Sequence, residues 1–196
     1  MHTKRFATLL LGMWLAGSIF MMAVATWNFA GVDRLLAEPD MSANQYIKVL
    51  GADSARMLLR HQVAELNRTY FDAWEVAQFG IGITLIVTLL FATNGERLYM
   101  IGCGLLLLLV LVEHFLLTPQ ITGIGRLIDF VPPDAPSPER VRFWRFHNAY
   151  ATLEVLKLLL LIGLSARLLI IQSRRRNRPR KKLDLVDDAE NGGVDR

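Results

Sequence analysis

Four stretches of the chain are almost entirely apolar and long enough to cross a lipid bilayer. Crossing a hydrocarbon core about 30 Å thick takes roughly 20 helical residues. The stretches cover residues 6–29, 73–93, 98–118 and 146–171. Because lipid offers no hydrogen-bond partners to exposed backbone groups, each stretch is expected to be helical. The pattern therefore predicts four transmembrane helices.

The segments between these stretches predict one further helix and two breaks. In residues 54–74, apolar side chains recur at helical spacing and most charges fall on other faces. This is typical of an amphipathic helix that lies on the membrane surface or extends the second span outward. Asn94 and Gly95 favour a tight turn after the second span. Pro119 is expected to end the third helix, and the prolines of residues 131–139 are expected to keep that segment irregular.

This pattern predicts an all-α fold: an integral membrane four-helix bundle with an external amphipathic helix after the first span. The membrane domain is expected to cover residues 1–173. Residues 174–196 begin with RRRNRPRKK and end with DLVDDAENGGVDR. This basic and then acidic tail is expected to be disordered.

The positions of lysine and arginine orient the predicted helices. Lysine and arginine next to span ends favour the cytoplasmic side of a membrane. Two precede the first span, one lies in the turn after the second, and seven lie in RRRNRPRKK after the fourth. The connections 31–72 and 119–144 contain five and three. Both termini are therefore predicted to be cytoplasmic, and both longer connections external.

A secretory signal sequence is an alternative interpretation of the first stretch. Lys4 and Arg5 precede it, and Ala23-Val24-Ala25 forms an A-x-A cleavage site. The apolar part is longer than the roughly 7–15 residues of a typical signal peptide. Cleavage would leave three spans with the tail still inside the cell.

Composition and charge also bear on the class of protein and on its partners. The 196 residues are 53% hydrophobic, with a mean hydropathy of +0.32 and a formal net charge of +4. Because the cations gather in RRRNRPRKK, we expect this cluster to contact anionic lipid headgroups, and we expect no nucleic-acid partner. Cys103 is the one cysteine, so no internal disulfide can form, and it is expected to be a packing or lipid-facing residue.

The small residues of the first stretch and the positions of the tryptophans predict where helices pack together and where the membrane interface lies. Small residues are spaced for close helix contact in the first stretch, at Gly12, Ala16, Gly17 and Ala23. Trp14 lies too deep for the membrane interface and is expected to pack between helices. Three further tryptophans lie near external span ends, where an aromatic belt is expected: Trp27, Trp74 and Trp144.

Eight polar residues interrupt the later three spans: Glu75, Gln78, Glu113, His114, His147, Asn148, Glu154 and Lys157. An ionisable group in a lipid-spanning helix costs about 2.5–3.5 kcal/mol on insertion scales and needs a partner or water. With the orientation above, all eight lie in the outer half of the bundle, where they are able to converge on one pocket. Glu154 and Lys157 are three residues apart and can pair directly, whereas His147 and Glu154 are seven apart and share a face.

Three roles fit this polar cluster. The first is a structural network, which makes the chain a structural or accessory membrane protein. The second is a small-solute or proton pathway. The third is a metal- or haem-associated redox site with His114 and His147 as candidate ligands beside carboxylates. No HxxxH, HExxH or EF-hand spacing and no nucleophile–base pair is present, so no catalytic residue is predicted and an enzyme is the less favoured class.

The third span ends with a threonine-proline followed by a basic residue, and a basic segment that contains a histidine introduces the fourth; the residues are Thr118, Pro119, Arg126, Arg142, Arg145, His147 and Asn148. In these residues, and over most of residues 6–171, the chain resembles the four-span family that includes transmembrane protein 205 and many bacterial relatives, described as a domain of unknown function. The resemblance implies a bacterial inner-membrane protein without an agreed biochemical activity. A more distant likeness to copper-resistance D-type proteins and to a four-span haem-associated oxidase family is one of fold. Against a haem site, the first span contains no histidine.

Overall fold

The computed structural model describes residues 2–93, 96–132 and 135–176, which are helical apart from short connections. The first half contains α1 (His2–Ala37), α2 (Met41–Leu50) and α3 (Ala52–Thr93). The second half contains α4 (Arg97–Val112), the π-helical turn η1 (Glu113–Leu117), α5 (Thr118–Ile128) and α6 (Pro138–Arg176). The predicted all-α fold is confirmed for these ranges.

Some predictions fall on residues outside these ranges. They include the turn at Asn94 and Gly95, part of the proline-rich segment at Pro133 and Asp134, and the tail from residue 177 onward. Helix α6 continues to Arg176, a little past the expected end of the membrane domain at residue 173.

The connection after the first span is mostly helical. Helix α1 continues to Ala37, and the predicted amphipathic helix 54–74 lies in the N-terminal part of the 42-residue helix α3. Residues 52–79 contain no glycine or proline, so nothing interrupts the helix before the apolar part. Of the two interpretations of residues 54–74, an extension of the second apolar helix is confirmed.

Two residues set the sharp reversal between α1 and α3. The Asp40 side chain accepts a hydrogen bond from the Ala43 N–H at 2.7 Å, which caps the start of α2. After the end of α2, Gly51 has a φ of 83°, in the left-handed region that favours glycine. Its N–H donates to the Ile47 carbonyl at 2.9 Å. Helix α2 therefore joins the ends of two long antiparallel helices.

The prediction that Pro119 ends the third helix is wrong. The backbone N–H of Thr118 donates to the Glu113 carbonyl five residues earlier, so one turn is π-helical, and Pro119 then lies in the first turn of α5. Proline breaks a regular helix because it lacks an N–H and its ring clashes with the carbonyl four residues back. A widened turn just before it changes that spacing, and the helix continues to Ile128.

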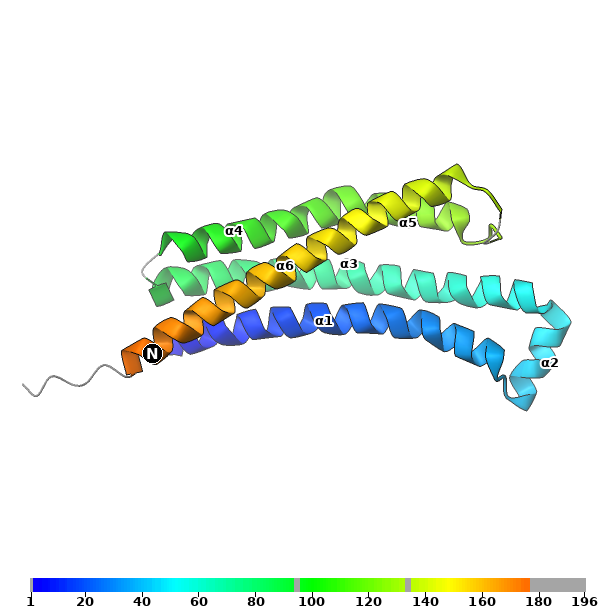
Figure 1. Ribbon diagram of the computed structural model, residues 1–196, viewed down its shortest axis with the longest axis horizontal. Coiled ribbons are helices and arrows are strands. Elements are labelled where there is room, and N and C mark those ends of the chain that lie inside the picture. The colour runs from blue at the N-terminus through cyan, green and yellow to red at the C-terminus, as the bar shows by residue number, and fades with distance from the viewer. Residues whose placement is uncertain (1, 94–95, 133–134, 177–196) are drawn as a thin grey trace, which may run out of the picture.

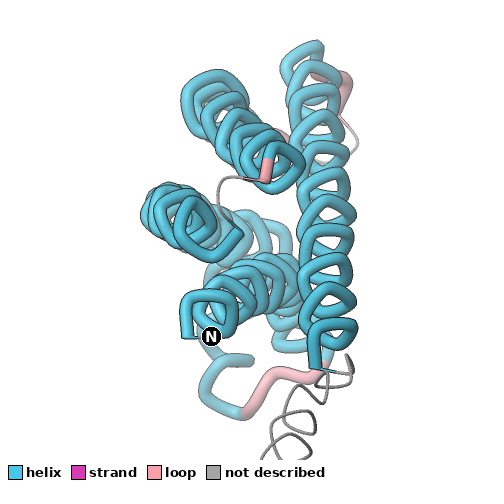
Figure 2. Tube along the Cα trace, turned by 90° about the vertical axis from the view of Figure 1, so that its left-hand side faces the viewer, coloured by secondary structure: helices cyan, strands magenta, loops and turns pink. Residues whose placement is uncertain are grey.

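Figure 1 shows the long helices side by side, with α1 next to α3 and α4 on the opposite side of α3. Helix α6 runs diagonally: it contacts α5 and η1 near its start, and α4 and α1 as well, and Figure 2 shows it on one flank of the other helices. The start of α1 and the end of α6 lie at the same end of the molecule, and α2 lies at the other. This arrangement surrounds an interior to which all the long helices contribute.

The apolar core occupies the half of the molecule toward the chain ends. Its fully buried members come from α1, α3, α4 and α6, and include Leu11, Leu85, Leu106 and Leu161. Cys103 belongs to this core and is 1% exposed, so the packing role expected for it is confirmed. Polar residues replace this core further along the helices, at the level of η1.

Two glycines permit close approach of α3 to its neighbours. The ring of Trp74 lies against Gly17 of α1, and Leu107 of α4 lies against Gly82 of α3. The predicted small-residue contact is thus confirmed at Gly17 but is wrong at Gly12, around which there is open space. Trp74 is consequently a packing residue, whereas the other two tryptophans expected in an interfacial belt, Trp27 and Trp144, are exposed.

Three helices are long and apolar enough to cross a membrane, and they cover residues 3–37, 52–91 and 97–128. Large apolar side chains are exposed along them, among them Phe20, Phe91 and Ile101, each more than 60% exposed. Apolar surface on this scale indicates contact with lipid or protein, and here the helix lengths favour lipid. These helices and their exposed apolar side chains indicate a membrane protein.

Candidate functional site

The centre of the polar interior is Lys157 of α6, which is completely buried. Its Nζ donates hydrogen bonds to Glu154 Oε1 at 2.8 Å, to Gln78 Oε1 at 2.9 Å and to Glu113 Oε2. These three acceptors use all three N–H groups of the ammonium. The predicted Glu154–Lys157 pair is confirmed, and α3 and η1 supply the other two partners.

Trp14 connects α1 to this network. Its indole Nε1 donates to Gln78 Oε1 at 2.9 Å, and its ring is fully buried, so its predicted position between helices is confirmed. Three buried atoms of the network, Gln78 Nε2, Glu113 Oε1 and Glu154 Oε2, have no hydrogen-bond partner among the described residues. Unpartnered polar atoms in a dry interior are costly, and they are most often found where water or a ligand is bound.

Glu75 is the centre of a second, adjoining group. Its Oε1 accepts hydrogen bonds from Thr118 Oγ1 at 2.6 Å and from the Tyr150 hydroxyl at 3.1 Å. Its Oε2 lies 2.9 Å from His114 Nδ1. Because a carboxylate has no proton to donate, Nδ1 is assigned as the protonated nitrogen. Glu75 is 0% exposed, and no lysine or arginine of the described residues contacts it.

Consecutive residues of η1 serve the two groups. Successive side chains of a helix point in clearly different directions. Since η1 contacts both α3 and α6, Glu113 reaches Lys157 on α6 while His114 reaches Glu75 on α3. The π-helical turn lies at these two residues, and such turns are frequent at functional sites.

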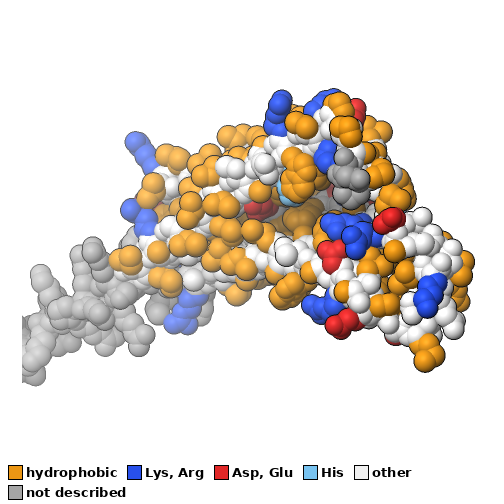
Figure 3. Space-filling view, turned by 45° about the vertical axis from the view of Figure 1, so that its right-hand side comes forward, with side chains coloured by type: hydrophobic (Ala, Val, Ile, Leu, Met, Phe, Trp, Pro, Cys, Tyr) orange, Lys and Arg blue, Asp and Glu red, His pale blue; other side chains and the backbone are white. Residues whose placement is uncertain are grey.

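His114 is also the link to the surface. Its ring packs edge-on against Phe79 and Phe115, with centroids 5.8 and 4.8 Å away, and its side chain is 23% exposed. Beside it, a cavity of about 440 Å³ opens between α3 and the η1–α5 segment. The residues that line the cavity are Glu65, Arg68, Thr69, Asp72, His114, Phe115, Thr118, Pro119, Thr122 and Arg126. Figure 3 shows a hollow on this side of the molecule, with acidic and basic side chains gathered next to it.

Two of the expected cluster members lie elsewhere. His147 and Asn148 are exposed, and His147 stacks on Phe143 and contacts the edge of Trp144. The sequence allowed the eight polar residues to converge, and the structure brings six of them together: Glu75, Gln78, Glu113, His114, Glu154 and Lys157. Among the described residues, His114 shares a group of possible metal ligands with Asp72 and Glu75 and not with His147.

Sequence reasoning missed the residues that complete the Glu75 group. Thr118 and Tyr150 carry hydroxyls, which an apolar helix accepts more easily than a charge, so neither interrupts its stretch. The available signal was position: Tyr150 is one helical turn before Glu154, and Thr118 is one turn after His114. Asp72, three residues before Glu75 on α3, lies at the cavity with its Oδ1 3.7 Å from His114 Nδ1.

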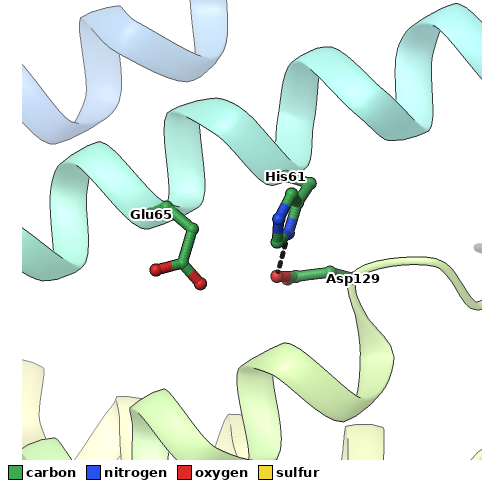
Figure 4. Close-up of side chains that lie close together, drawn as sticks. All are labelled: His61, Glu65 and Asp129. Atoms are coloured by element: carbon green, nitrogen blue, oxygen red, sulfur yellow. Dashed lines mark hydrogen bonds and ion pairs between the residues drawn. The ribbon is translucent and has the colours of Figure 1, made fainter.

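A separate charged cluster joins α3 to α5 toward the α2 end. His61 Nδ1 lies 2.8 Å from Asp129 Oδ2, as Figure 4 shows, and the Glu65 carboxylate lies close by. Arg68 donates to both oxygens of Asp129 at 2.9 and 3.0 Å, and Arg126 donates to both oxygens of Glu65 at 2.8 and 2.9 Å. Because the guanidinium groups already neutralise these carboxylates, His61, Glu65 and Asp129 form an ion-pair network more readily than a metal site.

The buried charges of the two central groups do not balance. Glu75, Glu113 and Glu154 are at most 4% exposed, and Lys157 is the ammonium buried with them. Three carboxyl groups share one ammonium, so the negative charge that the ammonium does not offset must be neutralised by a proton, on a carboxyl or on His114 beside Glu75, or by a bound cation. Uncompensated charge in a low-dielectric interior is strongly unfavourable, so the arrangement suits the uptake of positive charge from the cavity.

No family model, curated protein or solved structure matches the chain.

Proposed function

We propose that the chain is a four-pass membrane protein whose polar interior binds a cation that enters from the external side. Helix α6 would be the fourth span. Its charged residues Glu154 and Lys157 point inward, while Val155, Leu159 and Ile162 are exposed as lipid-facing residues would be. An even number of spans agrees with the position of both described chain ends at one end of the molecule.

The proposed bilayer position follows from helix length. About 20 residues cross the hydrocarbon core, so a span that starts at Arg97 ends close to Leu117 and leaves α5 outside. The same length places residues 52–72 of α3 outside. Residues 52–72 and α5 then form a part of the molecule outside the bilayer, where water reaches the charged side chains. This part contains the ion pairs of Arg60, His61, Arg68 and Arg126.

The bilayer position also indicates from which side of the membrane the cation would enter. Lys4, Arg5 and Arg97 lie at the end opposite α2, which favours that end as cytoplasmic. The cavity beside His114 then opens to the outside. We also retain the bacterial inner membrane as the location and the transmembrane protein 205-like family as the relationship that the sequence motifs favour. Two of these motif residues have defined partners, since Thr118 bonds to Glu75 and Arg126 to Glu65.

The single observation that carries the proposal is the excess of buried carboxylates around Lys157. A purely structural network would tend to balance its charges, as the external pairs of Arg68 and Arg126 do. A small-solute carrier or receptor for a cation needs a negative interior that opens on one side. Glu75 is the residue that connects this interior to the cavity, through His114.

Glu75→Gln tests this function by removing one negative charge while keeping an oxygen for Thr118 and Tyr150. Purified full-length protein in detergent is heated in buffers that contain sodium, potassium, magnesium, calcium, manganese or zinc. A cation at about a hundredfold excess over its Kd adds about 2.7 kcal/mol, which is a rise of about 5 °C or more in Tm. We expect such a rise for at least one cation in the wild type and none in Glu75→Gln.

The matched control is Glu38→Gln, which removes a charge from an exposed position at the end of α1. It should keep the wild-type response. If no cation changes the wild-type Tm, and Glu75→Gln is equally less stable in every buffer, the network is structural and the proposal is wrong.

A further inference from the structure

Three potential metal ligands meet at the edge of the cavity: Asp72 and His114 line it, and the fully buried Glu75 lies next to them. A carboxylate oxygen of Asp72, a carboxylate oxygen of Glu75 and a ring nitrogen of His114 all lie within 4.8 Å of one another. Asp72 and Glu75 are three residues apart on α3 and therefore share a face, and His114 approaches them from η1. Helix α3 and the turn η1 thus bring two carboxylate oxygens and one imidazole nitrogen close together.

The distances fit a transition-metal ion. Metal–nitrogen and metal–oxygen bonds of about 2.0–2.2 Å at a tetrahedral ion place neighbouring donor atoms about 3.4 Å apart. His114 Nδ1 is 2.9 Å from Glu75 Oε2 and 3.7 Å from Asp72 Oδ1, and a metal ion bound here would take the place of the proton that Nδ1 carries in its contact with Glu75. These two distances differ from the tetrahedral spacing by about 0.5 and 0.3 Å, and the Asp72 and Glu75 oxygens lie within 4.8 Å of one another.

The surroundings orient these donors as metal sites require. Thr118 and Tyr150 both hold Oε1 of Glu75, which leaves Oε2 directed to His114. Hydrogen bonds that fix a ligating carboxylate in this way are a common feature of metal sites. Of the ligands, Asp72 is 64% exposed and Glu75 is fully buried, so an ion could arrive from water and be held by an interior charge.

The positive groups of the cavity do not compete for these carboxylates. Arg68 and Arg126 line the cavity, but their guanidinium groups bond to Asp129 and Glu65. Glu75 is itself one of the three buried carboxyls that share the Lys157 ammonium, so a cation held by Asp72, Glu75 and His114 would also offset part of that buried negative charge.

We infer that Asp72, Glu75 and His114 bind a divalent first-row transition-metal ion, of the class of zinc or manganese, that enters through the cavity. A mixed imidazole and carboxylate set suits these ions, whereas Cu(I) prefers sulfur. No cysteine or methionine lines the cavity, and Cys103 lies in the apolar core. The inference rests on the proposed function and names the class of cation that the site takes.

Isothermal titration of the purified full-length protein in detergent, without a histidine tag, tests the site. Zinc and manganese chloride are the probes, and magnesium chloride is the comparison. We expect one zinc or manganese ion per chain, bound at least tenfold more tightly than magnesium. Asp72→Asn should weaken binding by tenfold or more, and His114→Ala should abolish it.

Two histidine variants are matched controls. His147→Ala changes an exposed ring away from the cavity, and His61→Ala changes the other histidine that lies near two carboxylates. Both should bind the metal as the wild type does. Because Asp72 is mostly exposed, Asp72→Asn is expected to fold normally, which size-exclusion chromatography and the Tm in metal-free buffer verify.

Transition-metal binding that survives Asp72→Asn and His114→Ala, or that is lost in His61→Ala, would overturn the assignment. So would an affinity for zinc and manganese no greater than that for magnesium. A Tm that rises with sodium or potassium and depends on Glu75, in a protein that binds no transition metal, would overturn the metal class and leave the proposed function standing.

Discussion

Lys157→Met is expected to cause the largest loss of stability of any single charge removal in this protein. The variant leaves Glu113 and Glu154 buried without the ammonium that contacts both of them, and Gln78 loses a donor as well. Removing one partner of a buried ion pair typically costs about 3–5 kcal/mol. We expect a strongly reduced yield of monodisperse protein in detergent and a Tm well below that of the wild type, measured by size-exclusion chromatography after heating.

Further variants distinguish the loss of the Lys157 charge from the loss of side-chain packing as the cause of the lower Tm. Methionine fills a volume similar to that of the lysine side chain, so the lost group is chiefly the charge. Adding Glu113→Gln and Glu154→Gln to Lys157→Met should restore much of the Tm, because the uncompensated carboxylates are then removed. Lys48→Met, at an exposed position in α2, is the matched control and should melt as the wild type does. A triple variant no more stable than Lys157→Met would contradict the charge explanation.

The same residues show which parts of the site could be predicted from the sequence. The Glu154–Lys157 pair is a local contact between residues three apart on one helix, and helical geometry alone predicts it. The contacts of Lys157 with Glu113 and Gln78 join residues 44 and 79 positions apart, so they depend on how the helices pack. A sequence pattern gives the depth of such residues in the membrane but not their partners.

The position of His147 shows why residue spacing alone does not predict which side chains of a long helix are buried. The buried positions of α6 are Tyr150, Glu154, Lys157, Leu161, Leu164 and Leu168, which alternate by three and four residues. A strict seven-residue repeat would continue this line to His147. An α-helix has 3.6 residues per turn, so the line drifts by about 20° per seven residues. One turn earlier, the half-buried positions are Phe146 and Phe143, and His147 is turned outward.

The long helices and their apolar faces follow directly from the sequence, but the continuation through Pro119 does not. Whether a proline ends a helix depends on the backbone before it, and the π-helical turn at 113–117 has no composition signal of its own. This turn also determines where Thr118 and the cavity lie relative to Glu75. The geometry of the site therefore depends on a helical feature that the residue pattern did not indicate.

Gly17→Val is the second substitution expected to have a large effect, because it acts on the contact between α1 and α3. A Cβ at position 17 would clash with the indole ring of Trp74, whose Cζ2 and Cζ3 atoms would both lie 2.8 Å from it. A rigid bicyclic ring has no flexible end that can move aside, so the ring or the whole of α1 must shift. Overpacking of this kind costs about 1–3 kcal/mol and sometimes more.

Gly12→Val is the matched control, since it makes the same change in the same helix where nothing lies within 4 Å of the new Cβ. We expect Gly17→Val to lower the Tm of the detergent-purified protein by several degrees and Gly12→Val to leave it nearly unchanged. Trp74→Ala should partly rescue Gly17→Val, because it removes the group that clashes. Equal melting of the two valine variants would mean that α1 and α3 do not approach one another closely at Gly17. Since Trp74 directly precedes Glu75, Gly17→Val should also weaken the Glu75-dependent cation response, which Gly12→Val should preserve.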